Sequence, residues 1–586
     1  MGKFLYFFLI LLSFVCQLSA QQIDPQEVTI VRDSFGVPHI FSPTNDGVAY
    51  GLAWVQCEDQ FKTMQEILAA CRGLLGEITG KDGVVADIGI QFMGIAEFVE
   101  RRYNSDVKGA FKSYLESYVD GVNRYAEIHP EHILLNDLFP ITAKDVITGY
   151  LLGSAEISGA RKDLERILNG RIERDITKDL VEKGSNAFAF SPTITQDGKT
   201  YLAINSHQPL EGWYSWYEAH LHSEQGLNII GGTFVGGVSI FLGANEHLGW
   251  AHTVNYADFS DVYRLTVNDD HSAYLVDNKW LPLVKKKAKA RVKLLGFIKI
   301  PISRNFYETI YGPAFESNDE FYAWRFMAGQ TLKAAEQWWT MNFASNLDEF
   351  KEALDIRGIV STNIVYADRD NNIYYLSNGT IPKRDPQYDW SKVLPGNTSN
   401  TLTNMDDLIP LDSLPQVLNP ECGWVFNTNN TPFTASDPEC TPTESQLNEV
   451  MGYQESKKEN NRSLRFLELM EDRERLSYDD FKNIKYDHQY PSELRKIYGV
   501  DINAIMKMNS DDYPEVREAL LMIQQWDRKS DIDSEGATMF LSTIYAMNEL
   551  DRRKYQREGL AYQGLLEAKK QLLDHFGSIK DPLSKY

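Results

Sequence analysis

The sequence predicts an α+β protein built as an αββα sandwich, in which two stacked antiparallel sheets are covered by helices on their outer faces. Three observations predict this fold. Apolar residues fall at helical spacing from Thr44 to about Ile172, the pattern changes at Gly184 to short β-rich segments, and helical spacing returns after about Ser463. Alternate apolar residues of 185–254 would be buried between the two sheets, while helices cover the outer faces. We therefore expect the parts of the chain before and after Gly184 to share one core.

The first twenty residues predict a secretion signal. Lys3 precedes an apolar run over 4–15 that is too short to span a membrane, and Ala20 offers a small residue for cleavage. We therefore expect cleavage after Ala20, export to the periplasm and no stable membrane span. A lipoprotein anchor on Cys16 and a buried N-terminal helix are the alternatives.

Two local patterns precede the change at Gly184. Residues 27–41 alternate like strands around a Gly-Val-Pro turn and predict a β-hairpin. Residues 161–183 are the most charged stretch of the chain, which by itself indicates the solvated face of a helix.

Composition narrows the choice of partners. The chain has 586 residues, of which 43% are hydrophobic and 24% charged, as is typical of a folded protein. Its formal net charge of -23 repels phosphate backbones and indicates no basic face, so we expect no nucleic-acid partner. Cys422 and Cys440 could form a disulfide in an oxidising compartment, whereas we expect Cys57 and Cys71 as buried thiols. No cysteine or histidine spacing indicates a zinc site.

The junction at Gly184 suggests a chemistry. A serine hydroxyl needs a base to act as a nucleophile, and a free α-amine, with an intrinsic pKa of about 8, can serve when the serine is the first residue of a chain. Ser185 becomes a first residue only if the bond after Gly184 is cut, and glycine permits the strained backbone that such self-cleavage needs. The alternative is an ordinary Gly-Ser turn that enters a strand.

Several motifs give this junction a context. Four of them are KGSN at 183–186, NSHQP at 205–209, GWAHTVN at 249–255 and STNIVYAD at 361–368; others are RDSFGVPHI at 32–40, EDQ at 58–60, Arg72-Gly73, Glu77 with Gly80, Tyr311 to Pro313, 368–384 and NTNN at 427–430. In their order and spacing these motifs resemble the penicillin acylase family of N-terminal-nucleophile (Ntn) hydrolases. The resemblance covers nearly the whole chain after the signal.

The resemblance implies a division of the chain. Residues 21–165 would form a mostly helical light chain, 166–184 a spacer peptide, and 185–586 a heavy chain that begins at the nucleophile. The two chains, cut from one precursor, would remain together as a heterodimer with the αββα core of the Ntn hydrolases. The activity implied is hydrolysis of the amide bond of a small N-acyl substrate.

The resemblance also implies roles for single residues. Ser185 would be nucleophile and base, and the backbone N–H of Val254 with the side-chain amide of Asn363 would bind the oxyanion. His207 would position the serine amine through its backbone rather than act as a general base. Asn186, Asn205 and Arg384 would support these groups.

An acyl pocket and a metal site complete the implied site. The pocket would be lined by Ser154, Ile157, Ser158, Gln208, Phe241, Leu242 and Arg384. Small residues at 154–158 and a glutamine beside His207 argue against a phenylacetyl group and favour a different or longer acyl group. A structural Ca²⁺ ion would be held by carboxylates of Glu165, Asp258 and Asp261, with solvated acids as the alternative. No organic cofactor is implied.

Two other classes of function stay open from the residues alone. Eleven histidines allow a Ser-His-Asp hydrolase, although no Gly-x-Ser-x-Gly motif surrounds Ser185. An acidic, exported and aromatic-rich chain also suits a ligand-binding protein. Neither alternative would cut itself at Gly184.

Overall fold

The structure is a computed structural model that describes residues 23–161, 164, 166, 184–255, 257–294, 298–443, 459–471, 473–497, 500–550, 554, 555 and 557–585. The predicted signal at 1–20, nearly all of the predicted spacer at 166–184, and Glu165 lie outside the described residues. No helix in the described part of the chain is both long and apolar enough to cross a membrane.

The larger of the two central sheets has nine strands. In spatial order these are β1 (Thr29–Arg32), β2 (Pro38–Ser42), β5 (Trp216–Ser223), β6 (Asn228–Phe234), β7 (Leu242–Ala244), β8 (Leu248–Val254), β16 (Ser361–Asp368), β17 (Ile373–Gly379) and β19 (Gln416–Leu418). All neighbours are antiparallel except β2 and β5. That parallel pair joins segments on the two sides of Gly184, and the chain between them, which includes the helices of 45–157, provides the long connection that a parallel pair needs. The hairpin predicted over 27–41 is confirmed as β1 and β2.

The smaller sheet has three antiparallel strands, and the nucleophile strand lies in its centre. They are β20 (Trp424–Asn427), β3 (Ser185–Phe190) and β4 (Tyr201–Ser206). Strand β3 is buried on both faces, and its side chains alternate between them. Ala187 and Ala189 pack toward the nine-stranded sheet, whereas Phe188 and Phe190 pack on the other side against Phe481 and its neighbours.

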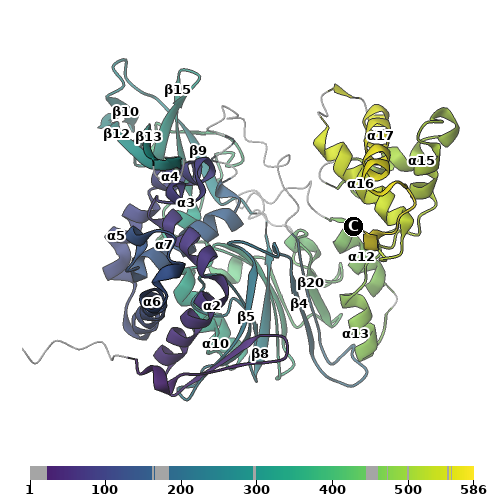
Figure 1. Cartoon of the computed structure of the whole chain (residues 1–586), viewed down its shortest axis with the longest axis horizontal. Coiled ribbons are helices and arrows are strands. Elements are labelled where there is room, and N and C mark those ends of the chain that lie inside the picture. The colour runs from purple at the N-terminus through teal and green to yellow at the C-terminus, as the bar shows by residue number, and fades with distance from the viewer. Residues whose placement is uncertain are drawn as a thin grey trace, which may run out of the picture.

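Helices cover the outer face of each sheet, which confirms the αββα sandwich (Figure 1). The larger sheet is covered by α2 (Asn45–Cys71), α5 (Ile95–Asp106), α6 (Gly109–Ile128), α7 (Ala143–Ile157), α9 (Ala334–Met341) and α10 (Leu347–Leu354), whereas α3 (Gly76–Thr79) and α4 (Lys81–Met93) pack against residues 284–294. The smaller sheet is covered by α12 (Asn461–Met470) and α13 (Tyr478–Lys485). One cluster of buried residues joins the helices before Gly184 to the strands after it, so the two parts share a core as predicted.

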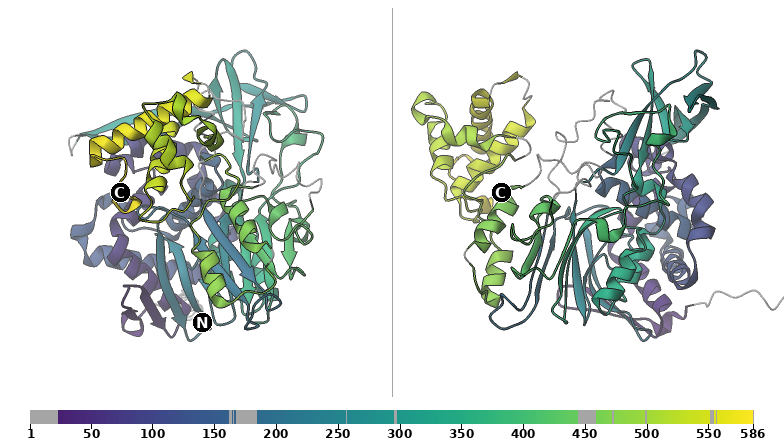
Figure 2. Two further views of the ribbon diagram at one scale, coloured as in Figure 1. Left: turned by 90° about the vertical axis from the view of Figure 1, so that its right-hand side faces the viewer. Right: turned by 180° about the vertical axis from the view of Figure 1, so that it is seen from behind.

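Two parts extend beyond the sandwich (Figures 1 and 2). One is a six-stranded sheet of β12 (Val284–Leu294), β13 (Ile298–Thr309), β14 (Gly312–Ser317), β15 (Glu320–Phe326), β9 (Ser260–Leu265) and β18 (Leu394–Pro395), beside the hairpin of β10 (Ala273–Val276) and β11 (Lys279–Pro282). The other is a C-terminal group of helices: α14 (Ile502–Lys507), α15 (Arg517–Gln524), α16 (Glu535–Glu549) and α17 (Arg557–Phe576). These helices have an apolar core of their own, which the sequence patterns did not predict.

The cysteines are all free thiols in the described structure. Cys57 and Cys71 are buried, as expected, and burial raises the pKa of each thiol. Cys422 and Cys440 lie beside each other without a disulfide, and burial together with a hydrogen bond to Cys422 raises the pKa of Cys440.

Candidate active site

The Gly184–Ser185 bond lies where β3 begins, and its carbonyl already has two donors. The hydroxyl of Ser185 donates to the carbonyl oxygen of Gly184 over 2.7 Å, and the backbone N–H of His207 donates to the same oxygen over 3.0 Å. Ser185 pairs with Ser206 across β3 and β4, which places His207 next to the bond. Ser185 is 2% exposed in the uncut chain. The serine hydroxyl and a polarising donor therefore meet at one carbonyl.

The ring of His207 explains why residue 184 is glycine. A Cβ atom built on Gly184 would lie 2.2 Å from Nδ1 of His207, a distance that real Cβ atoms do not show. The other ring nitrogen lies 3.5 Å from the amide nitrogen of Asn186. Burial, and then the charge of Arg462, lower the pKa of His207, which favours the neutral ring. No hydrogen bond among the described residues joins this ring to Ser185, so the contacts agree with a positioning role.

Asn429 is the side chain that meets the serine nitrogen. The N–H of Ser185 donates to Oδ1 of Asn429 over 2.8 Å, and Nδ2 of Asn429 donates to the carbonyl of Val254 over 2.9 Å. Asn429 follows β20 with a left-handed φ of 68°, a conformation that asparagine tolerates better than most residues. A bond from its own N–H to Asn427 holds this turn, and both side chains are buried.

Arg462 binds the same group from the first turn of α12. Its Nη1 donates to the carbonyl of Ser185 over 2.6 Å and to Oδ1 of Asn186 over 2.7 Å, and its Nη2 donates to Oδ1 of Asn429 over 2.8 Å. Asn460 caps this helix and also donates to the carbonyl of Thr428 over 2.8 Å. These bonds fix the start of α12 against the turn at 427–430.

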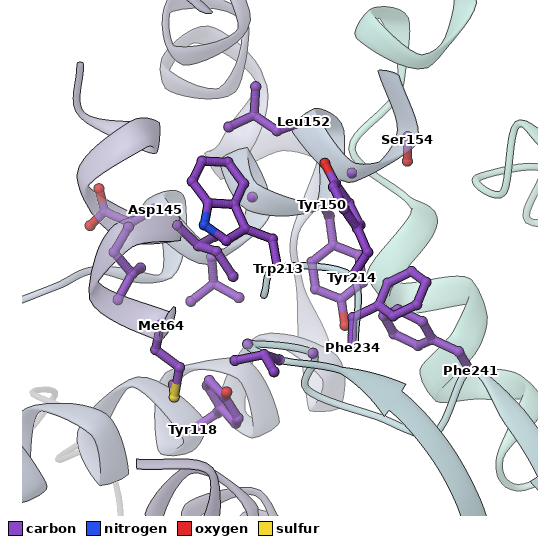
Figure 3. Close-up of a pocket in the computed structure, with 18 of the residues that line it drawn as sticks. Met64, Tyr118, Asp145, Tyr150, Leu152, Ser154, Trp213, Tyr214, Phe234 and Phe241 are labelled. Carbon is purple, nitrogen blue, oxygen red and sulfur yellow. The ribbon is translucent and has the colours of Figure 1, made fainter. Parts of the chain in front are cut away.

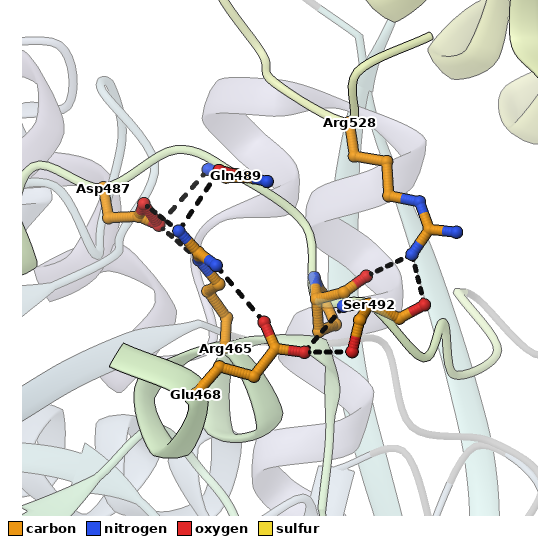
Figure 4. A network of polar contacts seen from close by, with 7 residues as sticks. Arg465, Glu468, Asp487, Gln489, Ser492 and Arg528 are labelled. Carbon is orange, nitrogen blue, oxygen red and sulfur yellow. Dashed lines mark hydrogen bonds and ion pairs between the residues drawn. The ribbon is translucent and has the colours of Figure 1, made fainter. Parts of the chain in front are cut away.

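A polar network one turn further along fixes α12 itself (Figure 4). Arg465 makes two bonds to Asp487, at 2.8 and 3.0 Å, and one to Glu468 at 3.2 Å. Glu468 in turn accepts the N–H of Ser492 over 2.7 Å. The network joins α12 to the segment that leads to the C-terminal helices, and so fixes the helix that carries Arg462.

Asn363 shares the carbonyl of Val254 with Asn429, and within the described part of the chain no hydrogen bond joins Asn363 to Ser185. Its Nδ2 donates to Oγ1 of Thr253 over 3.0 Å, to Oδ1 of Asn427 over 3.2 Å and to the carbonyl of Val254 over 3.3 Å. Its Oδ1 accepts the hydroxyl of Tyr375 over 3.0 Å. The described contacts of Asn363 are thus with supporting residues, and they favour Asn429 over Asn363 as the side-chain donor to an oxyanion beside Val254.

The sequence motifs contained Asn429 but gave it no role, and Arg462 was missed. The signal for Asn429 was the run of polar residues at 427–430 directly after a buried strand, a pattern typical of a functional turn. Arg462 had no sequence signal, because an arginine in the first turn of a helix is usually solvated. Of the supporting residues predicted, Asn186 contacts Arg462, and Asn205 pairs with Asn186 across β3 and β4.

An apolar pocket lies between the helices that precede Gly184 and the strands of the larger sheet (Figure 3). Its cavity volume is about 80 Å³, and its walls come from α2, α6, α7, residues 213–214 and 234–241, and Trp338. Of the predicted pocket residues, Ser154, Ile157 and Phe241 line it, whereas Ser158, Gln208, Leu242 and Arg384 do not. The labelled side chains in Figure 3 are mostly apolar or aromatic, with Asp145 at one side. Arg72 holds that carboxylate through two bonds of 2.7 and 2.8 Å and lowers its pKa against the effect of burial.

Hydrogen bonds connect this pocket to the nucleophile strand. Trp338, stacked on Phe241 in the pocket wall, donates its indole N–H to Nε2 of His252 over 2.9 Å. Burial lowers the pKa of His252 to about 4, which keeps the ring neutral and able to accept that bond. The hydroxyl of Ser206 donates to the carbonyl of His252 over 2.7 Å. The strand partner of Ser185 is therefore fixed to the back of the pocket wall.

The residues predicted to hold calcium bind an arginine instead. Arg384 donates to Oδ2 of Asp258 over 3.2 Å and to Oδ1 of Asp261 over 3.0 Å, and all three side chains are almost completely buried. The guanidinium supplies the positive charge that a metal ion would bring, so these two residues do not fit a calcium site. Arg384 is accordingly a partner of these carboxylates rather than a pocket residue.

One other group could hold a metal. Among the described residues, His129, Glu131 and His132 place three ligand atoms within 4.8 Å of one another. They lie at the C-terminal end of α6, on the partly exposed outer side of the helical layer. This group is not part of the arrangement around Ser185.

Comparison with known proteins decides the family. The family model described as penicillin amidase matches residues 27–580. The chain belongs to the penicillin amidase family. The matched residues include both the helices before Gly184 and the strands after it.

Individual members of the penicillin amidase family are more distant. The acyl-homoserine lactone acylase PvdQ of Pseudomonas fluorescens strain Pf0-1 is 25% identical over 62% of this chain and 52% of its own length. Penicillin G acylase of Escherichia coli is 21% identical over 70% of this chain and 60% of its own. The chain thus spans only about half to three fifths of these relatives. The solved thermostable penicillin G acylase from Alcaligenes faecalis, in its orthorhombic form, has a TM-score of 0.45 and 18% identity over 68% of this chain and 80% of its own.

Proposed function

We propose that the chain is a self-processing amidohydrolase that cleaves the amide bond of a small N-acyl substrate through an acyl-enzyme on Ser185. The observation that carries the proposal is the arrangement at the uncut bond, where the hydroxyl of Ser185 and the N–H of His207 both donate to the carbonyl oxygen of Gly184. Membership of the penicillin amidase family supports the same reaction class.

Maturation would proceed through the atoms already in contact. The oxygen of Ser185 attacks the carbonyl carbon of Gly184, and the N–H of His207 stabilises the negative charge that develops on the carbonyl oxygen. The hydroxyl proton passes to the amide nitrogen as the C–N bond breaks, which leaves Gly184 as an ester on the serine oxygen and frees the serine amine. Water hydrolyses the ester, and the products are a carboxylate at Gly184 and a heavy chain that begins at Ser185.

The free amine would then act as the base for catalysis. Oδ1 of Asn429 accepts a hydrogen bond from the nitrogen of Ser185, which orients the lone pair, and the charge of Arg462 nearby disfavours the protonated amine. The amine removes the hydroxyl proton as the serine oxygen attacks the substrate carbonyl, and returns it to the leaving amine. Water then hydrolyses the acyl-serine ester by the same path.

Two donors are available for the substrate oxyanion. Nδ2 of Asn429 uses one of its hydrogens on the carbonyl of Val254, which leaves a second hydrogen for a ligand. The backbone N–H of Val254 would be the other donor. His207, whose N–H serves the Gly184 carbonyl in the uncut chain, would act chiefly in maturation.

The pocket supports an apolar acyl group. Its lining is mostly aliphatic and aromatic, and the one carboxylate, Asp145, is neutralised by Arg72. The names of the relatives supply two candidate substrates, an acyl-homoserine lactone and penicillin G. In both, an amide nitrogen carries an apolar acyl group. Light and heavy chains would stay together through their shared core, and the sequence predicts that both are exported.

The test uses wild type and Ser185→Ala purified with protease inhibitors present throughout. We expect two fragments for wild type, with the larger beginning at Ser185, and a single uncut chain for Ser185→Ala. Mature wild type should release amine from N-acyl substrates, whereas the variant should release none. A fragment that begins at residue 185 in Ser185→Ala would assign the cut to another protease, and a single wild-type band would refute self-processing.

A further inference from the structure

Three side chains of the kinds that bind metal ions lie together where α6 ends. His129 caps α6, and the short 3-10 helix η2 (Pro130–His132) adds Glu131 and His132. Side chains three residues apart eclipse one another in a 3-10 helix. The rings of His129 and His132 accordingly stack, with centroids 5.4 Å apart and an angle of 9° between their planes. One turn of the chain therefore presents two imidazoles and a carboxylate side by side.

The separations between the ligand atoms resemble those around a tetrahedral metal ion. Oε1 of Glu131 lies 3.5 Å from Nδ1 of His129 and 3.8 Å from Nε2 of His132. Zn²⁺ holds such ligands at about 2.0–2.1 Å, so neighbouring ligands on a tetrahedron are roughly 3.4 Å apart. Both separations are longer than a hydrogen bond, which is about 2.7–3.2 Å. An ion placed between the three atoms would reach all of them after small shifts of the side chains.

The turn that carries these residues is fixed by the helix behind it. The buried side chain of Gln65, in α2, donates to the carbonyl of His132 over 3.0 Å and accepts the N–H of Leu134 over 2.7 Å. The ring of His129 lies against the buried ring of Tyr125, with centroids 4.4 Å apart. Ligands that are already held in place lose little conformational entropy when an ion binds.

We propose that His129, Glu131 and His132 bind a divalent transition-metal ion, for which Zn²⁺ is the best fit. Two imidazole nitrogens and one carboxylate oxygen form a ligand set typical of Zn²⁺, whereas Ca²⁺ and Mg²⁺ prefer oxygen ligands alone. Three protein ligands leave a fourth position for water. Glu131 and His132 are exposed, so the ion reaches the site directly from solvent.

The position of the site favours a cation and separates it from the nucleophile. The carbonyl groups at the C-terminal end of α6 carry the negative end of the helix dipole. Within the described part of the chain, no hydrogen bond or ion pair joins the three residues to Ser185 or Asn429. In Figure 1, α6 lies on the opposite side of the larger sheet from β4 and β20. The ion would therefore hold η2 to the end of α6 and stabilise the fold without a part in amide hydrolysis.

The first experiment titrates the whole purified protein, without a histidine tag, with Zn²⁺ in competition with a coloured chelator. Metal-free wild type should bind one Zn²⁺ per chain, and an excess of Ca²⁺ or Mg²⁺ should not displace it. His129→Gln with His132→Gln should lower the affinity for Zn²⁺ at least about 100-fold, because even the partners behind metal ligands commonly contribute 10- to 100-fold. The matched control, His488→Gln with His575→Gln, replaces two exposed histidines elsewhere and should bind like wild type.

Two variants of Glu131 distinguish coordination from simple attraction by a negative charge. Glu131→Gln and Glu131→His both remove the charge, but the second offers a third imidazole, and three histidines also form a zinc site. Glu131→Gln should weaken binding at least about tenfold, and Glu131→His should bind nearly as tightly as wild type. Equal losses in the two variants would overturn the assignment of Glu131 as a ligand.

Two further measurements report on the bound ion and on folding. X-ray absorption of the zinc form should show nitrogen and oxygen neighbours at about 2.0–2.1 Å, including two imidazoles. Added Zn²⁺ should raise the Tm of wild type and of the control but not of the double histidine variant, and melts without metal check that each variant is folded. Self-cleavage and amine release should be the same with and without Zn²⁺. Equal affinity for Zn²⁺ in the double histidine variant and its control, or a shell of oxygen neighbours without imidazole, would overturn the proposal.

Discussion

The close contact between Gly184 and His207 leads to a prediction about maturation alone. In Gly184→Ala the new methyl group would lie 2.2 Å from Nδ1 and 3.1 Å from Cγ of the His207 ring, so the ring or the strand must move. Forcing an extra carbon into such a contact costs about 1–3 kcal/mol. If this cost falls on the arrangement that cleaves, self-cleavage slows by roughly 5- to 150-fold. Removing the ring should relieve the contact, so Gly184→Ala with His207→Ala should cleave faster than Gly184→Ala alone, because the backbone N–H of residue 207 remains.

Pulse–chase labelling followed by a denaturing gel measures the rate of cleavage in each variant. Gly184 leaves the heavy chain on cleavage, so the mature fraction of Gly184→Ala should hydrolyse substrate at the wild-type rate per heavy chain. Cleavage of Gly184→Ala at the wild-type rate would refute the reasoning. A double variant no faster than the single one would show that the His207 ring is not the obstacle.

Three further variants test separate parts of the site. Asn429→Ala should lower kcat roughly 10²- to 10³-fold per mature heavy chain, whereas Asn363→Ala should lower kcat less than tenfold. Equal losses in the two variants would indicate that Asn363 also binds the oxyanion. Arg384→Ala leaves two buried carboxylates without their cation and should lower the free energy of unfolding by about 3–5 kcal/mol. Added Ca²⁺ should raise the Tm of this variant but not of wild type. A wild-type Tm that falls when a chelator is added would instead support the calcium site. Gly153 lines the pocket, and a Cβ atom built on it would have no other atom within 4 Å. The side chain of Gly153→Val should therefore fit without strain, occupy part of the pocket and shorten the longest acyl group that is accepted. The control Gly89→Val, in open space on α4, should leave that preference unchanged.

The spacing of apolar residues along the sequence was enough to predict the sheet and helix layers of the fold. The change from helical to strand spacing at Gly184 coincides with the start of β3, and the alternation Ala187, Phe188, Ala189, Phe190 has one face toward the larger sheet and the other toward helices. Such periodicity depends only on near neighbours, which is why it can be read from a single sequence.

Contacts between distant parts of the chain could not be read in this way. Asn363 and Asn429 are both asparagines in buried, strand-rich surroundings, and only the packing of the turn after β20 on β3 shows which one meets Ser185. Likewise, Asp258 and Asp261 look like metal ligands until Arg384, more than a hundred residues later, is seen between them. A net charge of -23 likewise conceals a local basic strand, because a sum over the chain carries no position.

The central claim is that Ser185 carries both self-cleavage and acyl transfer. Rapid quenching of the mature protein during turnover of an N-acyl p-nitroanilide, followed by peptide mass mapping, tests both at once. We predict a heavy chain whose first residue is Ser185, with the mass of the acyl group on its N-terminal peptide. An uncut chain that still turns over substrate, or an acyl group on a different peptide, would contradict the account.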